Sequence, residues 1–203
     1  FSALYGLGHA WMRLGKPAEA LSPLGRAVRV SPDDEAALDQ LALAQQQEKR
    51  FAEARDTLLR LTKLRPLDEG PLRRLATCRL ALGENEGELD ALATLARLVP
   101  DDLDVLESIA RGQLRMDRLE DSVASYERLL GLEPERLEAR RAVALTYPRL
   151  QRHDDTIRSS KSVLRARPDD QDVLLELARA LLQKGKAAEA AEAAAELVRL
   201  APK

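Results

Sequence analysis

The sequence has few residues from which a catalytic or metal centre could be built. Its 203 residues include one cysteine, Cys78, and two histidines, His9 and His153. A single cysteine excludes an intramolecular disulfide and a cysteine-rich zinc site. No glycine-rich phosphate loop, His–Glu metal motif or nucleophile elbow is present. We therefore predict that the chain is not an enzyme and holds no metal and no cofactor. We expect Cys78 to be a half-buried helix residue rather than a reactive thiol.

Aromatic residues and long apolar stretches are also scarce. Aromatic side chains make up 3% of the sequence, against 45% for all hydrophobic residues. Leucine and alanine supply most of the remainder and both favour helices, so we expect an all-α fold with an aliphatic core. No stretch approaches the roughly 18 consecutive apolar residues of a membrane-spanning helix, so no membrane insertion is expected.

Neither sign of charge is in clear excess. The 32 basic and 34 acidic residues give a net charge of −2, which argues against a general electrostatic attraction to nucleic acid or an anionic membrane. The chain begins at Phe1, inside an expected helix, without an initiator methionine or a signal-peptide pattern. We therefore expect a fragment of a longer protein, located in the cytoplasm or, alternatively, in the periplasm.

A strict proline spacing dominates what is present. Prolines stand at Pro32, Pro66, Pro100, Pro134, Pro168 and Pro202, each 34 residues from the next. At the average proline frequency, such an alignment has a chance probability on the order of one in ten thousand or lower. Within each interval, apolar residues recur at three- and four-residue steps, as they do on the buried face of a helix. Each interval thus predicts two amphipathic helices joined by a short turn.

The first interval illustrates the pattern. Its first helix carries an apolar stripe of Leu4, Leu7, Gly8 and Trp11, and its second helix carries Ala20, Leu24, Ala27 and Val28. A small residue recurs at one place in every interval, where two helices must approach closely: Gly8, Ala42, Ala76, Ala110, Ala144 and Ala178. Acidic residues that follow the prolines, such as Asp34, Asp102 and Asp170, are suited to cap the next helix.

This order of large, small and aromatic residues with a closing proline resembles the tetratricopeptide repeat family along the whole chain. The resemblance implies a right-handed α-solenoid of stacked helix-turn-helix hairpins whose first helices line a concave groove. It implies one domain, residues 1–203, with about six repeats: 1–34, 35–68, 69–102, 103–136, 137–170 and 171–203. Trp11 and Tyr147 occupy the same repeat position and are expected in the core.

Some positions depart from the repeat pattern. Pro23, followed by Gly25, falls inside the second helix of the first repeat, where it should bend or delay that helix. Pro148 falls near the end of the first helix of repeat five, and Ser159 and Ser160 in the same repeat replace residues that are usually bulkier in the family. We expect repeat five to be the least tightly packed interior repeat. Alternatively, Pro148 merely shortens a helix at its last turn.

The family geometry also implies which side chains line the groove. An aliphatic stripe, which includes Leu175 and Leu182, is expected to run beside a basic one. The residues predicted to bind a partner are His9, Met12, Arg13, Leu43, Arg73, Leu80, Glu107, Arg111, Leu114, Arg115, Arg141, Leu145, Arg149 and Arg179. Such a lining suits a protein partner that presents an apolar helix or extended segment flanked by carboxylates, or a small GTPase. Alternatively, neighbouring helices share the leucines, and the arginines pair with Glu107, Glu138, Asp104 and Asp172 of the chain itself.

We predict a non-enzymatic protein–protein interaction scaffold or adaptor in a bacterial motility, polarity, envelope-assembly or secretion complex. The single asparagine, Asn85, excludes the lysine–asparagine clamp with which one subclass of the family binds C-terminal carboxylates. Nucleic acid is disfavoured because acids interrupt the basic stripe and aromatic platforms are missing. Two alternatives stay open: a recruiting segment of a larger enzyme, and self-association through the uncapped final helix, Ala187–Leu200.

Overall fold

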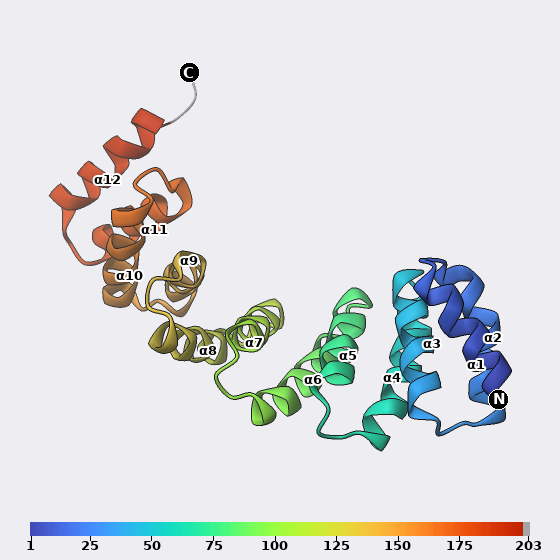
Figure 1. Cartoon of the computed structure of the whole chain (residues 1–203). Helices are drawn as coiled ribbons and strands as arrows, with labels where there is room; N and C mark the ends of the chain where they lie inside the picture. Colours follow the sequence, from blue (N-terminus) through green and yellow to red (C-terminus); the bar gives the residue numbers. More distant parts are fainter. Residues whose placement is uncertain (201–203) are drawn as a thin grey trace. The chain divides into compact units, whose positions relative to one another are not determined.

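The computed structural model describes residues 1–200, and within them the chain forms twelve α-helices and one short 3-10 helix, with no strand (Figure 1). The predicted all-α fold is therefore confirmed. The chain divides into two compact units, Phe1–Pro100 and a second that begins at Asp101. Pro202, the last proline of the regular spacing, lies outside the described residues.

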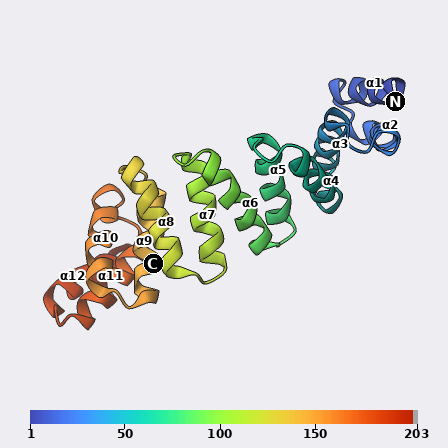
Figure 2. The same cartoon turned by 90° about the horizontal axis from the view of Figure 1, so that it is seen from below.

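The first unit contains six helices in three hairpins. They are α1 (Ser2–Arg13), α2 (Pro17–Val30), α3 (Glu35–Gln47), α4 (Phe51–Leu64), α5 (Glu69–Ala81) and α6 (Asn85–Leu98). Each helix packs against the next along the chain, and α1 also contacts α3, as Figure 2 lets the reader follow. The unit is thus a stack in which every hairpin buries its apolar face against its neighbours.

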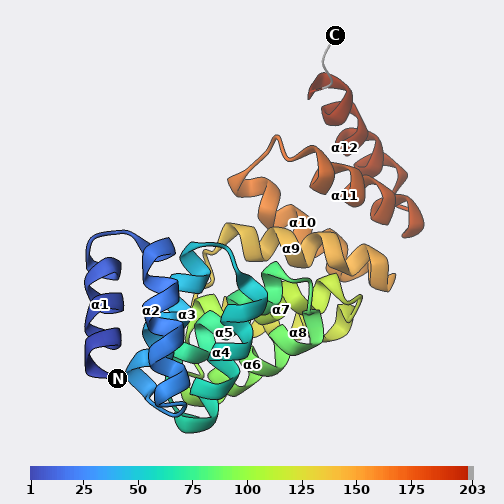
Figure 3. The same ribbon diagram turned by 90° about the vertical axis from the view of Figure 1, so that its right-hand side faces the viewer.

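The second unit repeats this organisation with one interruption. Its helices are α7 (Leu103–Arg115), α8 (Leu119–Leu132), α9 (Leu137–Thr146), the 3-10 helix η1 (Tyr147–Leu150), α10 (His153–Ala166), α11 (Gln171–Gln183) and α12 (Ala187–Leu200). Consecutive helices again pack together, and α9 contacts α11 (Figure 3). The fold is that of an all-α helical repeat solenoid. That the repeats form a single domain stays a prediction.

The acidic residues after the prolines cap helices as predicted. The side chain of Asp34 accepts a hydrogen bond from the Ala37 amide at 2.8 Å, and that of Asp102 accepts one from the Val105 amide at 3.0 Å. Arg136 occupies the equivalent place before α9 and makes no such side-chain cap. The helix that starts repeat five therefore lacks a stabilising contact that its counterparts have.

The turn inside each hairpin places one residue in the left-handed backbone region. These residues are Gly15, Lys49, Gly83, Asp117, Gln151 and Gly185, each 34 positions from the next, with φ between 56° and 73°. Their side chains differ but their backbone conformation does not. The left-handed residue lets the chain reverse direction directly after the first helix of every hairpin.

The small residue of each repeat lies at a close contact between helices. A Cβ atom added to Gly8 would lie 2.5 Å from Cγ and 2.7 Å from Cδ2 of Leu24, which is fully buried on α2. The alanines at this position in the other repeats are also buried, with exposed fractions of 0% to 7%. Close approach of the two helices, as predicted, explains the small side chain.

We expect Gly8→Ala to lower the free energy of unfolding by about 1 to 2 kcal/mol, because overpacking against Leu24 outweighs the helix propensity of alanine. Gly6 on the same helix is a matched control, since a Cβ there meets nothing within 4 Å. Gly6→Ala should raise the free energy of unfolding by about 0.5 to 1 kcal/mol. Urea unfolding of both variants measures the difference, and shifts of the same sign would contradict the close contact.

Two proline predictions had different outcomes. The prediction that Pro23 delays its helix is wrong, because α2 starts at Pro17 and continues through the buried Pro23. Pro17 occupies the first turn, where the missing amide hydrogen has no intrahelical partner in any case. Pro148, by contrast, does shorten its helix: α9 ends at Thr146, and the chain continues as the 3-10 helix η1.

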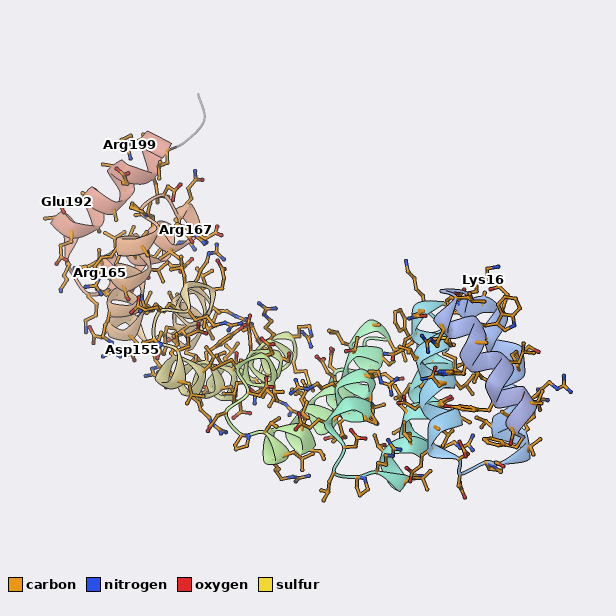
Figure 4. The ribbon with its side chains drawn as sticks, in the orientation of Figure 1. Lys16, Asp155, Arg165, Arg167, Glu192 and Arg199 are labelled. Atoms are coloured by element: carbon orange, nitrogen blue, oxygen red, sulfur yellow. The ribbon has the colours of Figure 1, made fainter. Side chains whose placement is uncertain are left out.

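Three predictions of burial need correction. Leu7 does not lie on the buried stripe, because its side chain is 50% exposed. Trp11 is half-buried, with the Lys16 ammonium 5.3 Å from its ring centroid, whereas its counterpart Tyr147 is buried as predicted (Figure 4 labels Lys16). Cys78 is fully buried rather than half-buried, and burial raises the pKa of its thiol, with Gln46 and Arg74 opposing the shift. This disfavours a reactive thiolate.

Candidate functional site

The residues predicted to bind a partner in the first unit lie on the first helices of the three hairpins. Half-buried His9 and Met12 and exposed Arg13 lie on α1, half-buried Leu43 on α3, and half-buried Arg73 and exposed Leu80 on α5. The rings of Phe1, which precedes α1, and of Tyr5 and His9 on α1 stack in sequence, with centroid separations of 5.8 and 5.9 Å. This column restricts the orientations available to the His9 ring.

The second unit carries the remaining predicted residues. Glu107 is buried on α7, with Leu114 half-buried and Arg111 and Arg115 exposed on the same helix. Arg141 and Leu145 are half-buried on α9, Arg149 is exposed on η1, and Arg179 is exposed on α11. That these residues line a groove stays a prediction.

The structure gives most of these arginines a carboxylate partner within the chain. Arg111 and Arg136 both bind the buried Glu107, the latter at 2.5 Å. Arg149 pairs with Asp117, and Arg179 donates to Glu176 at 2.7 Å. The basic stripe is therefore interleaved with acids, as the alternative interpretation of the sequence had it. Glu107 is committed to two guanidinium groups rather than directed to solvent.

Arg141 has the most extensive set of contacts. Its Nε donates to Asp170 at 2.7 Å, and its Nη2 donates to Asp172 at 2.5 Å. The side chain of Asp170 is 4% exposed and also accepts a hydrogen bond from the Val173 amide at the start of α11. Hydrogen bonds to Asp170 raise the pKa of the Arg141 guanidinium. Arg141 therefore connects α9 to the N-terminus of α11, which is a structural role.

Exposed apolar side chains accompany Arg179 on one face of α11. Leu175 is 40% exposed and Leu182 is 61% exposed. Residues 175, 179 and 182 are spaced by four and three positions, so they project from the same side of the helix. This face offers two leucine side chains with a guanidinium between them, and the ion pair of that guanidinium with Glu176 is itself partly exposed.

A small pocket adjoins this face. It has a volume of about 170 Å³ and is lined by residues that include Pro148, His153, Glu176, Arg179 and Gln183. Pro148 belongs to η1, so the pocket lies where the last turn of α9 is replaced by a 3-10 turn. Sequence reasoning did not find this pocket, because its walls come from three elements whose side chains meet only in the folded chain.

The hydroxyl of Tyr147, on η1, donates to Glu127 of α8, and the Arg152 guanidinium lies 4.6 Å from the centroid of its ring. Burial, together with the hydrogen bond to Glu127, raises the pKa of Tyr147 to about 12. The ring thus stays neutral and fixes η1 against α8.

Neither a metal-binding cluster nor a membrane-spanning helix is found in the described part of the chain. Among residues 1–200, no three histidine, cysteine or acidic side chains come together in a way that could hold a metal ion. None of the helices found there has both the length and the apolar character to cross a membrane.

Two parts of the chain match a known protein family. Sequence models of the tetratricopeptide repeat match residues 36–67 and 149–203. Curated proteins give no match to the chain.

The structure of a MamA protein is similar, with a TM-score of 0.71 at 14% identity, and covers 82% of this chain and 91% of its own. The structure of a tetratricopeptide repeat protein from Parabacteroides merdae has a TM-score of 0.67 at 18% identity and covers 100% of this chain and 80% of its own. The structure of YrrB has a TM-score of 0.70 at 13% identity and covers 84% of this chain and 88% of its own. The two family matches identify tetratricopeptide repeats at residues 36–67 and 149–203, and the solved structures share the fold of the chain.

Proposed function

We propose that the chain is a non-enzymatic scaffold that binds a segment of a partner protein on the α11 face formed by Leu175, Arg179 and Leu182. The observation that carries the proposal is the exposure of two leucines on a face that also holds an arginine. Burying these leucines under a partner would remove apolar surface from water, which favours association. Neighbouring half-buried Leu145 on α9 would extend the apolar surface.

The chemistry of this face indicates the chemistry of its partner. Arg179 is 62% exposed and its bond to Glu176 is a surface ion pair, so exchange of that carboxylate for one from a partner costs little. A guanidinium binds a carboxylate through two parallel hydrogen bonds. The partner is therefore a helix or extended segment with apolar side chains next to acidic ones, and the adjoining pocket admits one side chain.

The family supports a binding role over a catalytic one. Arrays of tetratricopeptide repeats serve as surfaces for other proteins. YrrB, one of the structures with the same fold, is described as a TPR protein with an unusual peptide-binding site. We extend peptide binding to this chain on the strength of its own exposed leucines, and we leave Arg141 out of the contact surface because Asp170 and Asp172 already occupy it.

The test is affinity capture from a native cell extract with the double variant Leu175→Glu and Leu182→Glu. We expect at least a tenfold loss of the captured partner, with unchanged helicity and melting temperature, because both side chains are exposed. Leu132→Glu is the matched control: Leu132 is 47% exposed on α8, outside the proposed face. A double variant that retains the same captured protein would eliminate the α11 face as the site.

A further inference from the structure

A second pocket lies between α8, α9 and α10, outside every residue assigned above to partner binding. Its volume is about 350 Å³. Leu130, Pro134 and Val143 supply apolar wall, and Arg140, Arg158 and Ser162 are among its polar lining residues. Two unusual residues of repeat five account for the pocket, as comparison with the other repeats shows.

Arg140 stands where other repeats have a buried leucine. Positions 38, 72, 106 and 174, spaced from 140 by multiples of 34, are all leucine and are at most 5% exposed. At 140 the side chain is 21% exposed, and its guanidinium turns away to Glu135 at 2.7 Å. Because a leucine in this position would fill the space between the helices, the substitution leaves an apolar hollow beneath a charged rim.

Ser162 stands where two other repeats have an arginine that covers the preceding turn. Arg60 in repeat two donates to the carbonyl oxygen of Pro32, and Arg128 in repeat four reaches Asp101 at 3.8 Å. The corresponding turn beside Ser162 is that of Pro134, which lines the pocket. The serine is too short to bridge the distance that the arginines span, so the pocket stays open on this side.

The rim of the pocket is basic, and each of its guanidinium groups is paired with a carboxylate. Glu135, which binds Arg140, is 87% exposed. Asp155, labelled near the start of α10 in Figure 4, is only 19% exposed but is shared between Arg152 and Arg158, so Arg158, which is 77% exposed, is not its sole partner. Surface ion pairs of this kind contribute little to stability. An incoming carboxylate can therefore take up either guanidinium while an apolar side chain enters the hollow.

We infer that this pocket is a second docking site, which takes an aliphatic side chain flanked by carboxylates from a partner protein. The apolar wall selects the aliphatic group, and Arg140 and Arg158 select the acidic neighbours. The site is independent of the α11 face, because the two share no residue. A partner that carried both kinds of segment would gain from binding two places at once.

The probe is the capped tripeptide Asp-Leu-Asp, titrated into the isotope-labelled protein and followed by amide chemical shifts. We expect shifts at Leu130, Val143 and Ser162, with a dissociation constant on the order of millimolar for so small a ligand. The capped tripeptides Asn-Leu-Asn and Asp-Ala-Asp separate the two requirements, since one lacks charge and the other lacks the apolar group. Each should bind at least fivefold more weakly.

Two variants locate the binding. Ser162→Arg should abolish it, because the new side chain fills the pocket as Arg60 covers the equivalent turn of its own repeat. Arg158→Gln, at a residue exposed enough to leave folding unchanged, should weaken binding of the acidic peptide but leave it stronger than that of Asn-Leu-Asn, because Arg140 still binds one carboxylate. The Leu175→Glu and Leu182→Glu variant should bind the peptide normally, which separates this site from the proposed function. Equal binding of the aspartate and asparagine peptides, shifts on α11 instead, or no shifts up to about 20 mM would each overturn the inference.

Discussion

Asp170→Ala is expected to lower the free energy of unfolding of the second unit by about 2 to 3 kcal/mol. The side chain is 4% exposed and caps α11 through the Val173 amide, 3.3 Å from Oδ1. It also accepts two hydrogen bonds from Arg141, at 2.7 and 3.3 Å. Loss of the cap costs about 1 kcal/mol. The remainder reflects a guanidinium left without its buried partner.

The contribution of Asp170 should depend on pH in a defined direction. Burial raises the pKa of the carboxyl. The hydrogen bonds from Arg141 and from the Val173 amide, together with the charge of Arg167, lower this pKa by more than burial raises it, so the pKa lies below its ordinary value of 3.8. Because the folded state holds the proton less tightly than the unfolded state, the stabilisation is fully present above about pH 4 and is lost as the pH falls through the lowered pKa. The cost of the substitution should therefore shrink at low pH.

Asp172 supplies the matched control. Its carboxylate accepts a hydrogen bond from the same guanidinium at 2.5 Å, but its side chain is 72% exposed. Asp172→Ala should cost no more than about 0.5 kcal/mol, as expected of a surface ion pair. Urea unfolding of both variants at pH 7 and pH 3 provides the comparison. Equal costs for the two variants, or a cost for Asp170→Ala that does not change with pH, would contradict the role assigned to the buried carboxylate.

The proline spacing was enough to predict the fold class and the position of most helices. A proline ends one helix and the side chain of an aspartate caps the next, as at Asp34 and Asp102, so neighbouring residues alone determine the boundary between the two helices. The left-handed turn residue was harder to predict. Lys49, Asp117 and Gln151 share the backbone conformation of the turn glycines, although nothing in their side chains requires it. Packing of the two helices imposes that conformation.

The candidate site was less accessible to sequence reasoning. The pairing of arginines with Glu107 and Asp172 could be predicted from the sequence. The buried partner of Arg141 could not, since Asp170 lies 29 positions away along the chain. Whether an arginine binds a partner or its own chain depends on this pairing. Arg140 does carry a signal in the sequence: alignment of positions 38, 72, 106, 140 and 174 shows one arginine among leucines. One arginine among aligned leucines indicates a pocket only when the structure shows that the arginine side chain points out of the core, as that of Arg140 does toward Glu135.

Leu129→Ala is expected to have the largest effect of the single substitutions considered, about 3 to 4 kcal/mol. Leu129 is fully buried on α8. It belongs to a cluster that includes Leu106 of α7, Val143 of α9 and Tyr147 of η1. Removing three carbon atoms there loses transfer free energy and leaves a cavity that rigid helices fill poorly. Because α8 connects the hairpin α7–α8 to α9, the substitution weakens the contact between repeats as well as the repeat itself.

Denaturant unfolding followed by circular dichroism should show both consequences. The midpoint falls, and the transition broadens as the two sides of α8 begin to unfold separately. Leu132→Ala, on the same helix but 47% exposed, should change the free energy of unfolding by less than about 1 kcal/mol and leave the transition sharp. If Leu129→Ala lowered the midpoint without broadening, the cluster would stabilise its own hairpin but would not couple it to the next. The array would then behave as independent hairpins at this junction.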